Sequence, residues 1–545
     1  SGDAGDIKFD AVPIFNLDKV EVVKGAGSAL YGTGALGGVI NVLTSAPTAT
    51  PIINVRAYSG IYTQPKYEQW QYTDRLRLHS GVNLGYMQKL GDLSLNVSGS
   101  YYNNQSYRDY DDSYNWNLFG KVAYDLSDFT NLTFLINSAA EDRADWVYWR
   151  NLDSALIPPA TSNRDIRINS VKHSIFSSVR HLINDDNFLN FKAGIFITDF
   201  SNSYSEIHPE YRQSNATQFN TELQMNSKLL SSLELTDGLN YMHISVDSKT
   251  YGISNQQIWS LYAQTEYDGI HSLILTAGGR FDVESASEID ANLQVSPKIG
   301  LSYNLIESLN FRASIGNGFR VPTIAERYAT VNFQGFKVIP NLSLLPEKSW
   351  SFEAGFNYEF NIAGMPIYID AALFNNELTD LIEPSFSTTG ASDIQFQNIS
   401  SARINGVEFT FRSFLFNLIG VESAITYMNP IDLATNDELK YRPNFLFYNK
   451  FVLPLGIVEL QADYRFKNKF NNIDSELALL VKDVDARVDI HIVDARIIFD
   501  LQKLLKDIPF TMTISANNLF DYYYAEMVGN LGATRYISLR FDGKF

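Results

Sequence analysis

The chain of 545 residues exceeds the size of one ordinary globular core, so several domains or one very large closed sheet are expected. Apolar residues make up 45% of the chain and charged residues 19%, which excludes intrinsic disorder and collagen-like repeats. The net charge of −18 argues against nucleic acid as a partner, and the lack of cysteine excludes disulfides, thiolate metal sites and cysteine nucleophiles.

No run of 18 apolar residues occurs, so any membrane-spanning part of this chain is expected to be a β-barrel. The first residues, Ser1 to Ala4, do not resemble a signal peptide. Helical spacing of apolar residues is nearly absent, and its best candidate, residues 501–506, is short.

Residues 17–43 consist of two short apolar segments around a stretch that holds six glycines. A phosphate-binding loop is a weak interpretation, because no Gly-Lys-Ser/Thr ends the stretch, no Gly-x-Gly-x-x-Gly spacing fits and no long helix follows. The favoured interpretation is irregular backbone packed compactly inside a larger structure.

Alternation of apolar and polar residues is the dominant pattern from about residue 52 onward. In one clear example, Phe352, Ala354 and Phe356 alternate with polar or small neighbours. This pattern predicts 22 strands. They are expected near residues 52–58, 81–87, 93–101, 116–126, 132–138, 171–180, 189–198, 219–227, 239–246, 259–267, 273–281, 293–303, 309–316, 350–360, 367–374, 405–412, 419–427, 445–453, 456–466, 488–499, 508–516 and 535–545.

The predicted connections alternate in length along the chain. Gaps after even-numbered strands hold a few residues, as at 127–131, whereas gaps after odd-numbered strands are long, as at 139–170 and 282–292. Short turns on one side and long loops on the other are typical of an antiparallel barrel in an outer membrane. The sequence therefore predicts an all-β fold, a 22-stranded antiparallel transmembrane β-barrel.

The last predicted strand has its apolar residues on one parity, and these include Phe541 and the terminal Phe545. One interpretation is an ordinary final strand. The other is an assembly signal, the C-terminal strand that barrel-assembly machinery recognises.

The glycine-rich stretch resembles the second half of the plug domain of TonB-dependent outer-membrane receptors. The matching positions are Val20, Glu21, Lys24, Gly25, Ser28, Tyr31, Gly32, Gly37, Gly38 and Asn41. Barrel motifs of the same family follow in order along the chain. Their key positions are Arg320, Pro322, Glu326, Pro346, Glu347, Gly406, Glu408, Asn517, Asn518 and Phe520. Ala26 stands where the family usually has proline, and the resemblance covers the whole chain.

The resemblance implies two domains, with residues 1–47 forming the C-terminal part of a plug inside the lumen and residues 48–545 forming the barrel. It implies a multi-pass protein of the bacterial outer membrane that imports a scarce, bulky nutrient. The chain length favours a ferric siderophore, cobalamin or haem as that nutrient. The implied partners are outer-membrane lipid, the barrel-assembly machinery, a small-molecule chelate and, in the periplasm, TonB.

The family's TonB box and first plug half are not among these residues. Residues too mobile to be placed, a shortened fragment, and a natural variant with a reduced plug are the three explanations considered. A reduced plug motivates two alternative functions, a receptor-derived barrel that scaffolds an outer-membrane complex and a passive pore.

One long predicted loop carries the candidate ligand residues Trp146, Tyr148, Trp149 and Arg150. Its aromatic side chains are expected either to contact a chelate or sugar, or to belong to the aromatic girdle at the membrane interface. A second aromatic cluster lies within residues 67–72.

No arrangement of residues indicates catalysis, so an enzyme is not expected, and neither is a cofactor or a preformed metal site. The seven histidines are scattered, without the i, i+2 or i, i+4 spacing of a metal site. Two less favoured alternatives are ligation by histidines from different loops, as in a haem receptor, and calcium binding by Asp109, Asp111 and Asp112.

Overall fold

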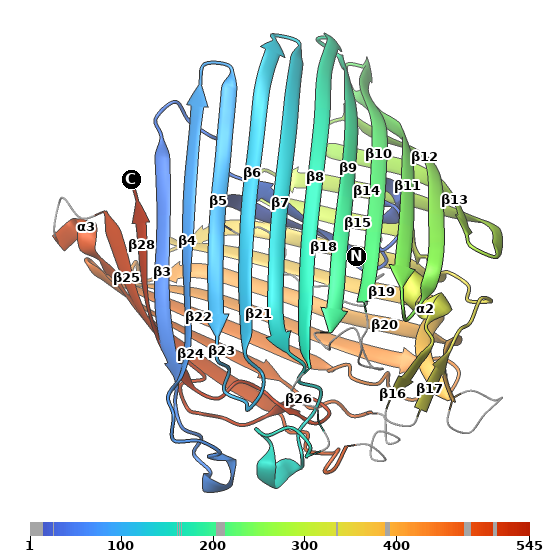
Figure 1. Cartoon of the computed structure of the whole chain (residues 1–545). Coiled ribbons are helices and arrows are strands. Elements are labelled where there is room, and N and C mark those ends of the chain that lie inside the picture. Colours follow the sequence, from blue (N-terminus) through green and yellow to red (C-terminus); the bar gives the residue numbers. More distant parts are fainter. Residues whose placement is uncertain are drawn as a thin grey trace.

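The computed structural model describes residues 15–25, 27–160, 162, 164, 166–202, 213–333, 336–386, 393–473, 481–504 and 509–545. A closed barrel of antiparallel strands dominates this part of the chain (Figure 1). The last strand of the barrel pairs with the first, so the sheet has no open edge.

Twenty-two long strands form the barrel wall within the described residues, which confirms the predicted fold class and strand number. Their bounds are β3 (Ile52–Tyr62), β4 (Arg77–Leu90), β5 (Leu93–Asn104), β6 (Ser113–Ser127), β7 (Thr130–Ala144), β8 (Arg167–Asn184), β9 (Asn187–Asn202), β10 (Gln213–Leu230), β11 (Leu233–Ser248), β12 (Gly252–Ile270), β13 (Leu273–Ala286), β14 (Ile289–Ile306), β15 (Leu309–Arg320), β18 (Glu347–Ile362), β19 (Met365–Phe386), β20 (Asp393–Leu415), β21 (Ile419–Asp432), β22 (Phe445–Leu455), β23 (Val458–Lys467), β24 (Ile490–Asp500), β25 (Phe510–Asn517) and β28 (Tyr536–Lys544). Every predicted strand corresponds to one of them.

Small elements lie in the connections. They are η3 (Glu68–Trp70), η4 (Leu152–Ser154), α2 (Ile324–Tyr328), β16 (Val331–Phe333), β17 (Phe336–Ile339), α3 (Leu501–Leu504), β26 (Ala525–Met527) and β27 (Asn530–Leu531). Strand β17 pairs with β16 and runs parallel to the first residues of β20. Among the described residues, no helix has the length and apolar character needed to cross a membrane.

The alternation in sequence becomes two chemically different barrel faces. On β14, Leu293, Val295 and Ile299 point outward and are 58%, 47% and 60% exposed. Their neighbours Gln294 and Ser296 point into the lumen and are 5% and 0% exposed. An apolar exterior with a polar interior is the arrangement that a bilayer imposes on a barrel.

The two ends of the barrel differ as the loop-length pattern predicts. At the upper end of Figure 1, turns of two or three residues join the strands, except that nine residues, including α3, join β24 to β25; most of the longer connections lie at the lower end. We call these the short-turn end and the long-loop end.

One predicted long loop, 282–292, is wrong. Strand β13 continues to Ala286 and β14 begins at Ile289, so only two residues join them. Asp282 and Glu284 fall within the predicted loop, but they are buried on the lumenal face of β13. Acidic residues that face the lumen therefore extend this strand beyond its apolar alternation.

The N-terminal described residues form a lumenal segment, residues 15–25 and 27–44. It consists of β1 (Leu17–Lys24), the single turn α1 (Ser28–Tyr31) and β2 (Gly38–Thr44). Strands β1 and β2 pair as an antiparallel two-stranded sheet that is separate from the wall and drawn in dark blue inside the barrel (Figure 1). Strand β2 ends at Thr44 and β3 begins at Ile52, and the predicted domain boundary at residue 47 lies between them.

Candidate functional site: the lumen and its outer mouth

The lumenal segment is attached to the barrel by residues from motifs far apart in the sequence. Lys24 forms an ion pair with Glu408, although 384 positions separate them. The Ser28 hydroxyl accepts a hydrogen bond from the Phe319 backbone N–H at 3.2 Å, and Ser28 itself is buried. The Leu36 carbonyl accepts one from a wall serine hydroxyl at 3.1 Å. The plug motif and the barrel motifs thus meet in the structure.

The turn after α1 makes a second set of contacts with the wall. The Gly34 backbone N–H donates to the Phe319 carbonyl at 3.0 Å, and the Thr33 hydroxyl accepts from the Val321 N–H at 3.0 Å. Gly32 has φ +74°, and a β-carbon there would lie 2.8 Å from the Arg280 guanidinium. This position therefore requires glycine both for its backbone angle and for its neighbour.

The remaining plug-motif residues divide between the sheet and the open lumen. Glu21 accepts a hydrogen bond from Asn41 at 3.2 Å across the two strands. Val20 and Tyr31 are exposed to the lumen. Gly25 has φ +73°, which favours glycine at the turn that ends β1.

The adjacent glycines Gly37 and Gly38 have different surroundings. Gly38 has φ +150°, and a β-carbon there would lie 2.6 Å from the Val23 carbonyl oxygen. No atom lies within 4 Å of the β-carbon position of Gly37. Of the two glycines, only Gly38 is therefore required by its backbone angle and its close neighbour.

Arg320 organises the start of the long connection after β15. Its guanidinium forms paired hydrogen bonds with Glu326 at 2.8 and 2.9 Å, and a further bond with Glu347 at 2.5 Å. The Thr323 side chain and Glu326 cap the first turn of α2 reciprocally. Pro322 accepts a hydrogen bond through its carbonyl from a wall glutamine at 3.2 Å. These motif residues fix the connection to the end of the wall.

A buried ion pair anchors the other end of α2. Arg327 and Glu284 are joined at 2.5 Å, and their side chains are 2% and 3% exposed. Gln256 also donates to Glu284, at 2.7 Å. The structure therefore ties α2 to β12 and β13 as well as to β18.

The motif at residues 517–521 builds the last connection. Asn518 has φ +49°, and its side-chain amide donates to the carbonyls of Tyr522 and Ala533 at 2.8 and 3.0 Å. Asn517 ends β25, and Phe520 is 72% exposed.

Two other motif residues lie near β18 and β20. Pro346 is buried beside β18. A β-carbon at Gly406 would clash with the carbonyl oxygen of Tyr427 on the neighbouring strand. Glycine at 406 therefore permits the close approach of β20 and β21.

The candidate ligand loop lies within a folded group of long-loop-end connections. Trp149 is fully buried and packs with a set we call the loop core. Its members are Trp70, Trp149, Ala155, Leu156, Val481 and Leu531. The indole N–H groups of Trp149 and Trp70 donate to the carbonyls of Lys482 at 2.8 Å and Leu152 at 2.6 Å.

The other residues of that loop surround the loop core. Trp146 donates to Asn530 at 2.6 Å and lies 4.7 Å from the Arg108 guanidinium, while Tyr148 packs against the core and Arg150 is exposed. Burial raises the pKa of the Asp145 carboxyl, and nearby Arg143 opposes that rise. A ligand role for Trp146, Tyr148 and Arg150 stays a prediction.

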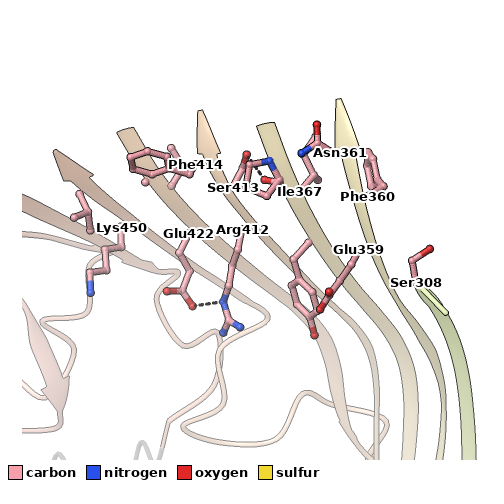
Figure 2. Close-up of a pocket in the computed structure, with 15 residues that line it drawn as sticks. Ser308, Glu359, Phe360, Asn361, Ile367, Arg412, Ser413, Phe414, Glu422 and Lys450 are labelled. Atoms are coloured by element: carbon pink, nitrogen blue, oxygen red, sulfur yellow. Dashed lines mark hydrogen bonds and ion pairs between the residues drawn. The ribbon is translucent and has the colours of Figure 1, made fainter. Parts of the chain in front are cut away.

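Three cavities line the lumen wall between β15 and β24. At the long-loop end, a cavity of about 380 Å³ lies beneath Tyr524. In the middle, one of about 420 Å³ separates Lys24 on β1 from the wall. At the short-turn end, the cavity of about 720 Å³ shown in Figure 2 contains the Arg412–Glu422 pair, joined at 3.0 Å, with Lys450 beside it.

The first and last of these cavities use residues that sequence reasoning missed, among them Arg465, Lys467, Arg412 and Lys450. The alternation of residues along these strands already indicates that these side chains point into the lumen. Within the part of the chain that the structure describes, no group of three histidine, aspartate or glutamate side chains is placed to hold a metal ion.

A closed barrel with an apolar exterior, a polar lumen and its own N-terminal segment fixed inside defines a plugged outer-membrane barrel. The family model described as TonB dependent receptor-like, beta-barrel matches residues 32–519, and the model for the TonB-dependent Receptor Plug Domain matches residues 1–39. The chain belongs to the TonB-dependent receptor family, and its outer-membrane location follows.

Several known proteins are similar to this chain. The vitamin B12 transporter BtuB of Photobacterium profundum is 22% identical over 459 residues, covering 81% of this chain and 67% of the transporter. A solved structure of the ferric enterobactin receptor PfeA of Pseudomonas aeruginosa has a TM-score of 0.78 at 17% identity, covering 97% of this chain and 85% of that one. The FrpB iron transporter of Neisseria meningitidis has a TM-score of 0.75 at 14% identity, covering 97% and 88%. These structural likenesses show the fold.

Proposed function

We propose that this protein imports a bulky nutrient chelate across the outer membrane, with TonB as the energy-coupling partner. The observation that carries the proposal is the attachment of the lumenal segment by separate polar contacts spread along it, among them those at Lys24, Ser28 and Thr33. Each contact of this kind contributes about 1 kcal/mol or less, so the segment is held in place yet can leave without unfolding the wall.

Two further observations agree with an importer. The three lumen cavities lie along one side of the wall, from the long-loop end to the short-turn end. The similar proteins are named as a vitamin B12 transporter and a ferric enterobactin receptor, and both ligands are bulky. We therefore place the cargo among ferric siderophores, cobalamin and haem, and assign no catalytic step to the chain.

Uptake in cells tests this proposal. A strain lacking the gene would be compared with its complemented parent for uptake of labelled ferric siderophores, haem and cyanocobalamin. We expect one of these compounds to depend on the gene, and the dependence to vanish in a background without TonB. Equal uptake of all compounds with and without the gene would contradict the importer. A large permanent conductance of the purified protein in planar bilayers would favour the passive pore.

A further inference from the structure

The outer face of the wall carries an acidic residue, Asp237, in the lower half of β11. Its neighbour Gly238 faces the lumen, because a β-carbon there would lie 2.6 Å from the hydroxyl of Tyr262, a residue that is only 2% exposed. Asp237 has the opposite parity, which it shares with Leu239, and Leu239 is 57% exposed. The Asp237 side chain therefore points toward the bilayer.

Two rows of aromatic side chains show the depth of Asp237 in the membrane. Tyr241 pairs with Trp259, and their ring centroids are 4.3 Å apart. Nearer the short-turn end, Leu233 pairs with Tyr267. Asp237 lies midway between these two rows along β11. Because outward-facing aromatic residues mark the two membrane interfaces of a barrel, the carboxyl group of Asp237 is expected at the level of the hydrocarbon between them.

The Asp237 carboxyl group lacks the kind of partner that other polar groups of the outer face have. The Ser423 hydroxyl, for example, donates to the Asn449 side chain at 3.1 Å on β21 and β22. Within the described residues, no hydrogen bond or ion pair reaches the Asp237 carboxyl group. The outward-facing residues of β10–β14, all of them described, include no lysine or arginine. A polar group at this depth costs free energy until it is hydrogen-bonded, which favours a partner outside this chain.

The wall beside Asp237 is recessed. Ala263, Gly279 and Pro297 lie in register with Asp237 on the next three strands. No atom lies within 4 Å of the β-carbon position of Gly279. The next row toward the long-loop end forms a ridge of exposed apolar side chains, Leu239, Leu261, Phe281 and Val295. The small residues leave room for another wall to approach the carboxyl group closely.

A second copy of this chain supplies what the Asp237 carboxyl group lacks. In its acid form a carboxyl group donates one hydrogen bond and accepts another, so two carboxyl groups satisfy each other. Two-fold symmetry is the commonest arrangement of two identical chains. An axis along the membrane normal keeps every residue at its own depth. The second copy therefore brings the same carboxyl group to the level of the first, whereas lipid headgroups lie at the interfaces.

We propose that the outer face of β11–β13 is the interface of a symmetric dimer within the membrane, in which the Asp237 carboxyl groups of the two copies bind each other. This inference goes beyond the proposed import function and does not depend on it, because neither the lumen nor a cargo takes part in the contact.

Crosslinking of the purified protein in vesicles of phosphatidylethanolamine and phosphatidylglycerol tests the dimer. The chain has no cysteine, so Ala263→Cys places a single thiol beside Asp237, where a short bismaleimide would join two copies. The matched control is Ala495→Cys on β24, ten strands further along the closed wall. Ala495 also lies in a row of small outward-facing residues, with Ala462 and Ala516, but that row has no carboxyl group.

The Ala263→Cys chain is expected to crosslink into dimers at least about fivefold more than the Ala495→Cys chain. Adding Asp237→Leu is expected to lower crosslinking at least about fivefold, because leucine suits lipid but forms no hydrogen bond. Adding Asp237→Asn is expected to keep crosslinking within about twofold, because an amide also donates and accepts. Heat-modifiability gels would show that each variant contains the folded barrel.

Counting copies gives a second measurement without a crosslinker. A fluorophore attached at Ala495→Cys, away from the proposed interface, would bleach in two steps per particle when Asp237 is present. Single steps are expected when Asp237→Leu is added.

Equal crosslinking with Asp237 and with Asp237→Leu, or at the two cysteine positions, would overturn the dimer interface. Loss of crosslinking in Asp237→Asn as well as in Asp237→Leu would also overturn it, since that result would assign the carboxylate to a cationic partner. None of these outcomes bears on nutrient uptake, so the importer proposal is judged separately.

Discussion

Lys24 on the lumenal segment and Glu408 on the barrel wall form an ion pair between two motifs that are 384 positions apart. Both motifs stand out in the sequence, but nothing in the sequence pairs these two residues. The pair lies in the lumen, where the Lys24 and Glu408 side chains remain 51% and 29% exposed. Its contribution to stability is therefore expected to be that of a surface salt bridge.

A double-mutant cycle with Lys24→Gln and Glu408→Gln measures this contribution. We expect a coupling free energy of about 0.2–1 kcal/mol, because solvent screens an exposed pair. The lumenal segment would carry a fluorophore on Tyr31→Cys, since the chain has no other cysteine, and its release would be followed in urea. Strictly additive costs of the two single changes would show that the pair does not hold the segment.

Gly38 and Gly37 give a second prediction with a built-in control. Gly38→Ala is expected to destabilise the lumenal sheet by about 1–3 kcal/mol, because a β-carbon meets the Val23 carbonyl and the backbone has φ +150°. Gly37→Ala is expected to change little, since open space surrounds its β-carbon position. The same fluorophore measures both variants. If the two cost the same, the contact with Val23 is not what requires glycine.

The buried pair of Arg327 and Glu284 is expected to behave differently from an exposed pair. Arg327→Gln leaves the Glu284 carboxylate buried without its cation, at a cost of about 3–5 kcal/mol. Arg412→Gln at the exposed Arg412–Glu422 pair is expected to cost at most about 1 kcal/mol.

Amide hydrogen exchange of residues 324–333 would report the loosening of α2. Protection there is expected to fall in Arg327→Gln and to recover in part when Glu284→Gln removes the orphaned charge. Unchanged protection in Arg327→Gln would mean that the contacts of Arg320 hold α2 on their own.

Strand number and side-chain parity follow from the sequence because a two-residue period is local. Phe352 and Phe356 face outward as their alternation predicts. Strand ends are harder to predict from the sequence, because acidic residues that face the lumen, such as Asp282, resemble loop residues. Only the closed barrel buries them. Local pattern therefore determines the face of a residue but not the end of its strand.

The candidate site could likewise be predicted only in part from local sequence pattern. The inward parity of Arg465 and Lys467 is readable from alternation, but their shared cavity with Ile490 and Tyr524 depends on strand tilt and on a loop held by Asn518. Trp149 suggested a ligand surface by composition, and the structure buries it because residues near 70, 481 and 531 converge on it. Contacts between residues so far apart in the sequence produce no periodic pattern from which they could be predicted.

The lipid-facing parity is testable at two adjacent residues of β18. Phe356→Arg is expected to cost about 2–4 kcal/mol, because its side chain points to the bilayer, where it lies 6.1 Å from the Phe311 ring between centroids. Asn357→Arg is expected to cost much less, because it points into the wet lumen. Unfolding in urea from lipid vesicles measures both. Similar costs at both positions would contradict the assigned faces.

At the terminal Phe545, a role in barrel assembly can be tested separately from a role in barrel stability. Its backbone N–H donates to the Ile53 carbonyl and its carbonyl accepts the Ile53 N–H, both at 2.9 Å, so these closing bonds do not depend on the side chain. The ring is 52% exposed on the outer face and contacts Phe510 edge-on at 5.5 Å between centroids.

Replacing Phe545 with Lys is expected to lower the yield of inserted barrel strongly, while Lys544→Glu has a small effect. The barrels that do form in the Phe545→Lys variant should unfold at nearly the wild-type urea concentration, since the closing backbone bonds remain. Heat-modifiability gels measure the yield, and urea titration of the folded fraction measures stability. An unchanged yield would assign Phe545 to an ordinary last strand, and a large loss of stability at normal yield would assign its ring to closing the barrel with Phe510.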